Sequence, residues 1–145
     1  MFFSQRVEYA LRAAVWLGGN EGEPRRTVDI AKGTKVPASY LSKVLQSLSR
    51  AGLVVGTRGL HGGFVLARPA SSVTVLEVVD AVEPIKRIHE CPLGIEEHGM
   101  NLCPLHHKLD EAIAGVERVF AGTTLADLVV GGSDPLCPAA SLVRD

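Results

Sequence analysis

Residues 37–68 read PASYLSKVLQSLSRAGLVVGTRGLHGGFVLAR, and this stretch decides the expected fold. Within residues 39–51, apolar side chains recur at intervals of three and four, which predicts an amphipathic helix with one buried stripe. The stripe consists of Leu41, Val44, Leu45 and Leu48. Gly52 is expected to end the helix, because glycine adopts the left-handed conformation at low cost. Leu53–Thr57 and Phe64–Ala67 then predict a two-stranded hairpin with a glycine-rich tip.

The opposite face of the predicted helix is polar. It carries Ser39, Lys43, Gln46 and Arg50, side chains that suit base edges and phosphates in a major groove. Arg58 lies on the glycine-rich tip, where a cation suits an adjacent minor groove or the phosphate backbone. A helix and hairpin of this kind indicate a winged helix-turn-helix. A hairpin domain that binds protein is the alternative.

The strings KVLQSLSRAGLV and TRGLHGGFVLAR resemble the recognition helix and wing of a family of bacterial winged helix-turn-helix regulators typified by IscR and NsrR. The wing string is the more specific of the two. The resemblance implies a homodimeric transcription factor, most simply a repressor, that binds double-stranded promoter DNA. Several members of this family sense iron–sulfur clusters, nitric oxide or redox state. The residues expected to contact DNA are Thr27, Ser39, Tyr40, Lys43, Gln46, Arg50, Arg58 and His61.

The composition indicates one domain with an aliphatic core. The chain has 145 residues, of which 46% are hydrophobic and only 5% aromatic. No apolar run reaches the roughly 20 residues that a membrane-spanning helix needs, and the N-terminus lacks the features of a secretion signal. We therefore expect a soluble cytoplasmic protein without a membrane partner. Three cysteines without such a signal favour thiols or metal ligands over a disulfide framework.

The net charge of −1 conceals two halves of opposite sign. Residues 1–70 contain ten Lys and Arg against four Asp and Glu, whereas residues 71–145 contain five against twelve. The first half therefore carries +6 and the second −7. A basic half joined to an acidic half is typical of a DNA-reading unit attached to a sensing or pairing unit.

The expected fold is mainly α with a small β-hairpin. Capping residues and glycines predict helices from Ser4 to about Leu17, over Val28–Lys32 between a Thr27 cap and Gly33, over Val75–Val82 after Thr74, from Pro104 to about Phe120, and over Leu125–Val130 after a cap at Thr123 or Thr124. We expect a winged helix-turn-helix domain at 1–83, a cysteine-containing sensor loop at 84–103, dimerisation helices at 104–130 and a flexible tail at 131–145.

The long helix that begins at Pro104 carries a single apolar stripe. Its members are Leu105, Leu109, Ile113, Val116 and Phe120. A lone helix with such a stripe needs a partner surface. In the family that the chain resembles, this helix packs against its twin across a two-fold axis, and packing on its own domain is the alternative.

The candidate chemistry lies in the pattern Cys91-x11-Cys103-x2-His106-His107. Cys103 precedes a proline that suits the first helical position, which makes Cys103 the expected N-cap. A helix N-terminus favours the thiolate, which is the form that reacts or binds metal. Either histidine could share a face with Cys103, and thiolates with imidazole suit an iron–sulfur cluster or zinc.

The family resemblance implies a particular ligand set for a [2Fe-2S] or other iron–sulfur cluster. Cluster-binding members carry three cysteines in this loop, and Cys91 and Cys103 match the outer two, while Glu97 stands at the middle position. His106 matches a fourth ligand of some members, and Glu8 an acidic ligand that other members draw from the partner subunit.

Several alternatives to this ligand set stay open. His98 and His107 could join it, and zinc, haem or no cofactor are possible instead; Cys137 also precedes a proline, as in weak haem sites. A histidine that one branch of the family uses at the end of the second helix corresponds to Gly33 here, so that mode is absent. Glu8 also lies four residues before Arg12, which favours a surface ion pair.

An enzyme that uses Cys103 with a neighbouring histidine is the least supported class of function. The sequence offers no third group to orient the histidine, no oxyanion-hole glycine motif and no cofactor fingerprint. We therefore expect a regulator and not an enzyme. The alternative within that class is a cofactor-free winged-helix regulator, controlled by thiol oxidation or by a partner protein.

Overall fold

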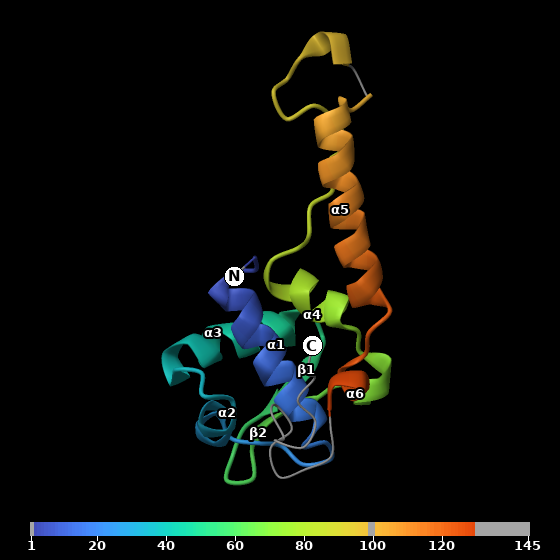
Figure 1. The fold of residues 1–145 in the computed structure, drawn as a ribbon. Helices are drawn as coiled ribbons and strands as arrows, with labels where there is room; N and C mark the ends of the chain where they lie inside the picture. Colours follow the sequence, from blue (N-terminus) through green and yellow to red (C-terminus); the bar gives the residue numbers. More distant parts are fainter. Residues whose placement is uncertain (1, 99–100, 130–145) are drawn as a thin grey trace.

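The computed structural model describes residues 2–98 and 101–129, so the predicted tail and Cys137 lie outside the described residues. Six α-helices, one hairpin and two short 3-10 helices follow one another in this part of the chain (Figure 1). They are α1 Gln5–Gly18, α2 Thr27–Thr34, α3 Ala38–Arg50, β1 Val54–Thr57, β2 Gly63–Leu66, η1 Ala70–Ser72, α4 Val75–Val82, η2 Glu96–His98, α5 Pro104–Ala121 and α6 Leu125–Leu128. The predicted combination of a mainly helical fold with a small hairpin is confirmed.

The core lies where α1, α3 and α4 pack on one another, and α2 and α6 close it. The predicted stripe of α3 is buried along its whole length, whereas the opposite polar face of this helix is exposed. The core is aliphatic, and its most deeply buried side chains are Val7, Ala10, Ala13, Leu17, Ile30, Leu41, Val44, Leu45, Leu48, Val73, Val78, Val79 and Leu125. Burial of this continuous apolar surface holds the helices together.

Side-chain caps fix the starts of three helices, as their sequences predict. The Ser4 hydroxyl accepts the Val7 N–H at the start of α1. Thr74 and Glu77 form a reciprocal capping box at α4, and Thr124 and Asp127 form another at α6. The backbone N–H and the hydroxyl of Thr74 hold the pKa of the Glu77 carboxyl below its usual value, and Arg68 adds to this effect.

The hairpin pairs β1 with β2 in antiparallel register, with Val54 opposite Leu66 and Thr57 opposite Gly63. Gly52 follows α3 with a φ of +73°, as predicted for the end of that helix. The loop before α2 also pairs with β2 through its backbone, which the sequence did not predict. Arg25 and Phe64 exchange both backbone hydrogen bonds at 2.8 Å, so the root of the hairpin is tied to the helical body.

The second helix differs from its prediction at both ends. Thr27 is its first residue and not its cap, because the N-cap position belongs to Arg26, which makes no side-chain cap. Gly33 does not end the helix, which continues to Thr34 and stops where Lys35 adopts a φ of +55°. Gly33 has a packing role instead: an added Cβ would lie within 3.0 Å of three indole atoms of Trp16.

We predict that Gly33→Ala lowers the free energy of unfolding by about 2 kcal/mol, because the methyl group overpacks the Trp16 contact. Chemical denaturation followed by circular dichroism measures this change. Gly115→Ala in α5 is the matched control, since the added methyl meets only an Arg118 side-chain nitrogen at 3.7 Å; it should stabilise by about 0.5–1 kcal/mol. Equal stability of Gly33→Ala and the unchanged protein would contradict this packing role.

Helix α5 stands out from the body, and residues 90–98 and 101–103 lie at its far end (Figure 1). Its 18 residues extend about 27 Å at 1.5 Å per residue. No residue of α5 is buried in the single chain, although Phe120 at its near end stacks on Phe3 with ring centroids 5.3 Å apart. Among the described residues, no helix combines the length and apolar character needed to cross a membrane.

Candidate nucleic-acid interface and sensor loop

Helix α3 presents a polar, cationic face to solvent. Ser39, Tyr40, Lys43, Gln46 and Arg50 are all exposed on it. Their positions follow from the buried stripe of the same helix, which leaves these residues on the outer side. The Lys43 ammonium lies 5.8 Å from the centre of the Tyr40 ring, a cation–π contact that orients both side chains.

Tyr40 also connects α3 with α1. Its ring meets that of Tyr9 edge to face, with the centroids 5.7 Å apart. The guanidinium carbon of Arg12 lies 5.8 Å from the centre of the Tyr9 ring. This aromatic contact holds Tyr40 in place in the first turn of α3. Both tyrosines and the two cations therefore form one surface at the junction of α1 and α3.

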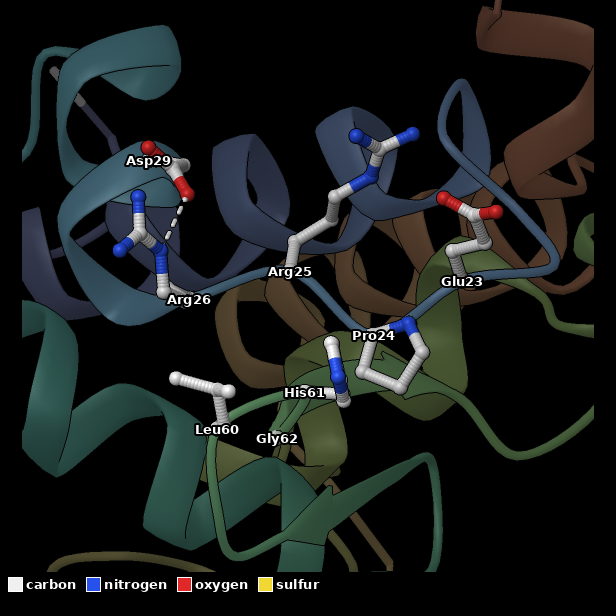
Figure 2. Close-up of a pocket in the computed structure, with 8 residues that line it drawn as sticks. All are labelled: Glu23, Pro24, Arg25, Arg26, Asp29, Leu60, His61 and Gly62. Carbon is white, nitrogen blue, oxygen red and sulfur yellow. Dashed lines mark hydrogen bonds and ion pairs between the residues drawn. The ribbon is translucent and has the colours of Figure 1, made fainter.

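The hairpin tip carries two more of the residues predicted to contact DNA. Arg58 and His61 are exposed on either side of Leu60. Between this tip and the loop before α2 lies a cleft of about 430 Å³, lined by Glu23, Pro24, Arg25, Arg26, Asp29, Leu60, His61 and Gly62 (Figure 2). Arg26 pairs with Asp29 at 3.1 Å. Thr27, the remaining predicted contact, is half-buried at the start of α2, beside this cleft.

Several exposed cations on and near α3 and the hairpin have no ion pair with any described residue. Among the described residues, Lys32, Lys35, Lys43, Arg50 and Arg58 are exposed and take part in no ion pair, and the same holds for Lys86 and Arg118 in the second half of the chain. Arg12, Arg26 and Arg68 are paired with carboxylates. Unpaired surface cations keep their full attraction for phosphate, so α3 and the hairpin carry charge that is available to DNA.

Cys103 and His106 come together at the start of α5. Cys103 is the N-cap, as predicted, but its sulfur makes no cap hydrogen bond to the first turn and lies instead 3.3 Å from the Nδ1 atom of His106. Pro104 occupies the first turn, as its spacing predicts. His107 is exposed, and its backbone N–H donates to the Cys103 carbonyl at 2.9 Å. His106 therefore shares a site with the Cys103 thiol, and His107 does not.

Cys91 is buried, with 8% of its surface exposed, and is a free thiol, as is Cys103. The Nδ1 atom of His98 is buried without a hydrogen-bond partner, and Glu97, at the place of the missing third cysteine, is exposed. Glu8 forms the expected ion pair with Arg12 at 2.9 Å. It lies on α1 in the body, away from the far end of α5 (Figure 1).

Within one chain, the predicted cluster ligands do not gather into one group. The described residues contain no group of three or more His, Cys, Asp and Glu side chains that could hold a metal ion. Cys103 and His106 are two adjacent donors, whereas an iron–sulfur cluster is held by about four. The predicted set, which includes Glu8 of a partner subunit, therefore stays a prediction.

An ion-pair clamp holds the incoming segment of the sensor loop against α5, and the sequence did not predict it. Arg87 donates to both oxygens of Asp110, at 2.7 and 2.6 Å, and to Glu117 at 3.1 Å. The Ile88 N–H donates to the same Asp110 carboxylate at 2.8 Å. The Arg87 bonds, followed by the Ile88 N–H, hold the pKa of Asp110 well below its usual range. These carboxylates in turn raise the pKa of Arg87.

An exposed cationic helix face, a hairpin beside it and cations along both that are unpaired in the described part of the chain define a winged-helix DNA-binding protein. The model of the Rrf2 family, described as an iron-dependent transcriptional regulator, matches residues 3–131. The chain belongs to the Rrf2 family. It is a DNA-binding transcriptional regulator and not an enzyme, which confirms the class expected from the recognition helix and wing.

Relatives and solved structures agree with this assignment. The HTH-type transcriptional regulator NsrR of Geobacillus kaustophilus is 31% identical over 135 residues, which cover 89% of this chain and 90% of the relative. The structure of CymR, the global cysteine regulator of B. subtilis, matches with a TM-score of 0.74 at 26% identity, over 88% of this chain and 95% of that one. T. potens IscR has the same fold, with a TM-score of 0.76 at 21% identity, over 100% and 94%.

Proposed function

We propose that the protein is a homodimeric repressor that reads double-stranded promoter DNA in the cytoplasm and responds to a redox-type signal through its cysteine-containing loop. In this proposal residues 1–83 read DNA, residues 84–103 form the sensor loop, and residues 104–130 pair two subunits. The observation that carries it is the exposed face of α3, where Lys43 and Arg50 form no ion pair with any described residue and lie beside a hairpin that bears Arg58.

The two α3 helices of a dimer would enter successive major grooves about 34 Å apart. Lys43, Gln46 and Arg50 have the donors that guanine and adenine edges and phosphates accept. Ser39, Tyr40 and Thr27 would fix register on the backbone. Arg58 and His61 on the hairpin would reach the flanking groove.

Exposed apolar surface along α5 supports the homodimer. Leu105 is 63% exposed, Leu109 46% and Val119 63%. These side chains lie on α5, whose apolar side is therefore largely open to solvent in the single chain. An apolar groove of about 370 Å³ lies beside the helix, lined by Phe2, Phe3, Ile85, Lys86, Ile88, Leu109, Ala112, Ile113 and Val116. A second copy of α5 would cover this surface and bring the two DNA-reading units into a fixed spacing.

The contact between Cys103 and His106 supports a signal received by the thiol itself. A thiol at a helix N-terminus with an imidazole beside it is a reactive arrangement. The clamp between Arg87 and α5 would transmit a change in the loop to the helix that pairs the subunits. In the alternative, Cys91, Cys103 and His106 of one subunit and Glu8 of a second would hold an iron–sulfur cluster, which requires the Glu8–Arg12 pair to open.

Two measurements test this proposal. Footprinting against the promoter region of its own gene should show a protected, two-fold symmetric site, and the absence of protection from well-folded protein under every redox condition would refute DNA-based regulation. Purification without oxygen, followed by iron and acid-labile sulfide analysis, separates the signals. Iron with sulfide supports the cluster, whereas colourless protein that still binds DNA supports the thiol.

We predict that Cys103→Ala removes the response of DNA binding to oxidant or nitric oxide while the fold and basal DNA affinity stay intact. His106→Ala should weaken the response in the same direction, because His106 is the group that contacts the sulfur. His107→Ala is the matched control and should respond as the unchanged protein does. Gel retardation with and without oxidant measures all three, and an unaltered response in Cys103→Ala would exclude the loop thiol from the mechanism.

A further inference from the structure

The hairpin is held rigidly at its root. Arg25 and Phe64 exchange two backbone hydrogen bonds of 2.8 Å, which makes the loop before α2 a third strand of the wing. Gly63 permits this close approach, because a Cβ there would lie at 3.0 Å or less from three backbone atoms of Arg25, and its φ is +147°. The side chain of Phe64 packs on the core. The wing therefore projects from the body in a fixed direction.

The tip of this wing exposes a leucine that none of the described residues covers. The Gly62 N–H donates to the Gly59 carbonyl at 3.0 Å, which closes a tight turn with Leu60 at its outer side. Leu60 is 90% exposed, the largest exposed fraction among the large hydrophobic residues described. Because it packs on nothing, Leu60 contributes almost nothing to the stability of the folded chain.

One unpaired cation stands next to Leu60 on the tip. Arg58 is exposed two residues away and takes part in no ion pair among the described residues. The cleft that Leu60 helps to line carries both signs of charge, because Arg26 is paired with Asp29 at 3.1 Å and Glu23 lies on the same side (Figure 2). In minor-groove proteins cations follow the phosphates and the narrow groove, while a Leu, Ile, Phe or Met side chain wedges between base pairs. The pairing of Leu60 with the free charge of Arg58 favours a nucleic-acid occupant over an apolar protein surface.

We propose that Leu60 is a minor-groove wedge, which inserts between two base pairs beside each half-site and opens the stack, so that the duplex bends. This rests on the proposed binding of DNA by the helix and wing. A wedge is accommodated most easily at flexible pyrimidine–purine steps, such as TA or CA/TG. Leu60 therefore gives the regulator a sequence preference at a position where it makes no hydrogen bond to a base.

The test uses the full-length protein and the duplex that footprinting defines. Single 2-aminopurine bases, placed in turn along the two flanks, become brighter where a base pair is unstacked, and circularly permuted fragments report the bend. With the unchanged protein, one flanking step in each half-site should brighten. Leu60→Ala should abolish that signal, reduce the bend and lower the affinity about tenfold, while the dependence of affinity on salt stays the same.

Two further variants separate the wedge from general binding. Leu60→Met keeps a long apolar side chain and should restore most of the brightening and the bend. Arg58→Ala should instead reduce the salt dependence, because it removes a cation and not the wedge. Equal brightening and equal bending with Leu60→Ala and the unchanged protein would overturn the wedge while DNA binding stands, whereas no binding by either protein would end both proposals.

Discussion

Lys43→Ala combined with Arg50→Ala should lower affinity for the footprinted duplex about 100-fold near physiological salt. Each side chain is exposed on α3 without an ion pair among the described residues, so its charge is available to DNA. Loss of a base or phosphate contact costs about 1–3 kcal/mol, and each lost phosphate contact lowers the slope of log affinity against log salt by about one. Fluorescence anisotropy across a salt series measures both quantities.

Lys108→Ala is the matched control for this prediction. It removes one positive charge, where the double variant removes two, from an exposed position of α5, at which Lys108 pairs with Glu111 at 2.7 Å. Its affinity and salt slope should match those of the unchanged protein. Both variants should fold normally, because none of the three side chains is buried. An unchanged salt slope in the α3 variant would show that DNA lies elsewhere.

Leu109→Lys combined with Ile113→Lys should convert the proposed dimer to monomer. Both residues line the apolar groove beside α5, and an ammonium buried there without a partner would cost several kcal/mol. Sedimentation velocity measures the oligomeric state. DNA affinity should fall by about 100-fold or more. A monomer binds only one half-site, whereas in a dimer the binding of one half-site holds the second DNA-reading unit close to the other half-site.

The fold of the monomer should survive this change, since no residue of α5 is buried in the single chain. Glu111→Lys supplies the control: it introduces the same side chain on the polar side of α5, where Glu111 is exposed. That variant should stay dimeric. A dimer that persists in the Leu109 and Ile113 variant would place the subunit contact on another face of the molecule.

Local patterns were sufficient to predict most of the helices and the hairpin. The stripe of Leu41, Val44, Leu45 and Leu48 specified one face of α3, and the caps at Ser4, Thr74 and Thr124 fixed where three helices begin. These signals lie within a few residues of one another, so the sequence contains them directly. The pairing of Glu8 with Arg12 and the N-cap position of Cys103 are also local features, which the sequence predicts directly.

Local patterns were misleading where a distant residue decides the conformation. Gly33 has the sequence context of a helix stop, yet it lies inside α2 because Trp16, on another helix, needs the space of its missing side chain. The Thr27 cap was wrong by one position for a related reason: the preceding loop is drawn into the wing by Arg25 and Phe64, and Arg26 enters α2 directly from it.

The amino-acid sequence by itself determined the class of fold, the polar face of α3, the cationic wing and the cysteine and histidine types available to the loop, because periodicity, caps and residue chemistry are local properties. Only the tertiary structure decided that His106 and not His107 meets Cys103, that Arg87 clamps the loop to α5, and that no described residue covers Leu60 at the tip of the wing. The physical reason is that some of these contacts join residues far apart in the chain, while others depend on which of two adjacent side chains faces a partner. Both are set by how the packed helices and strands orient side chains in space.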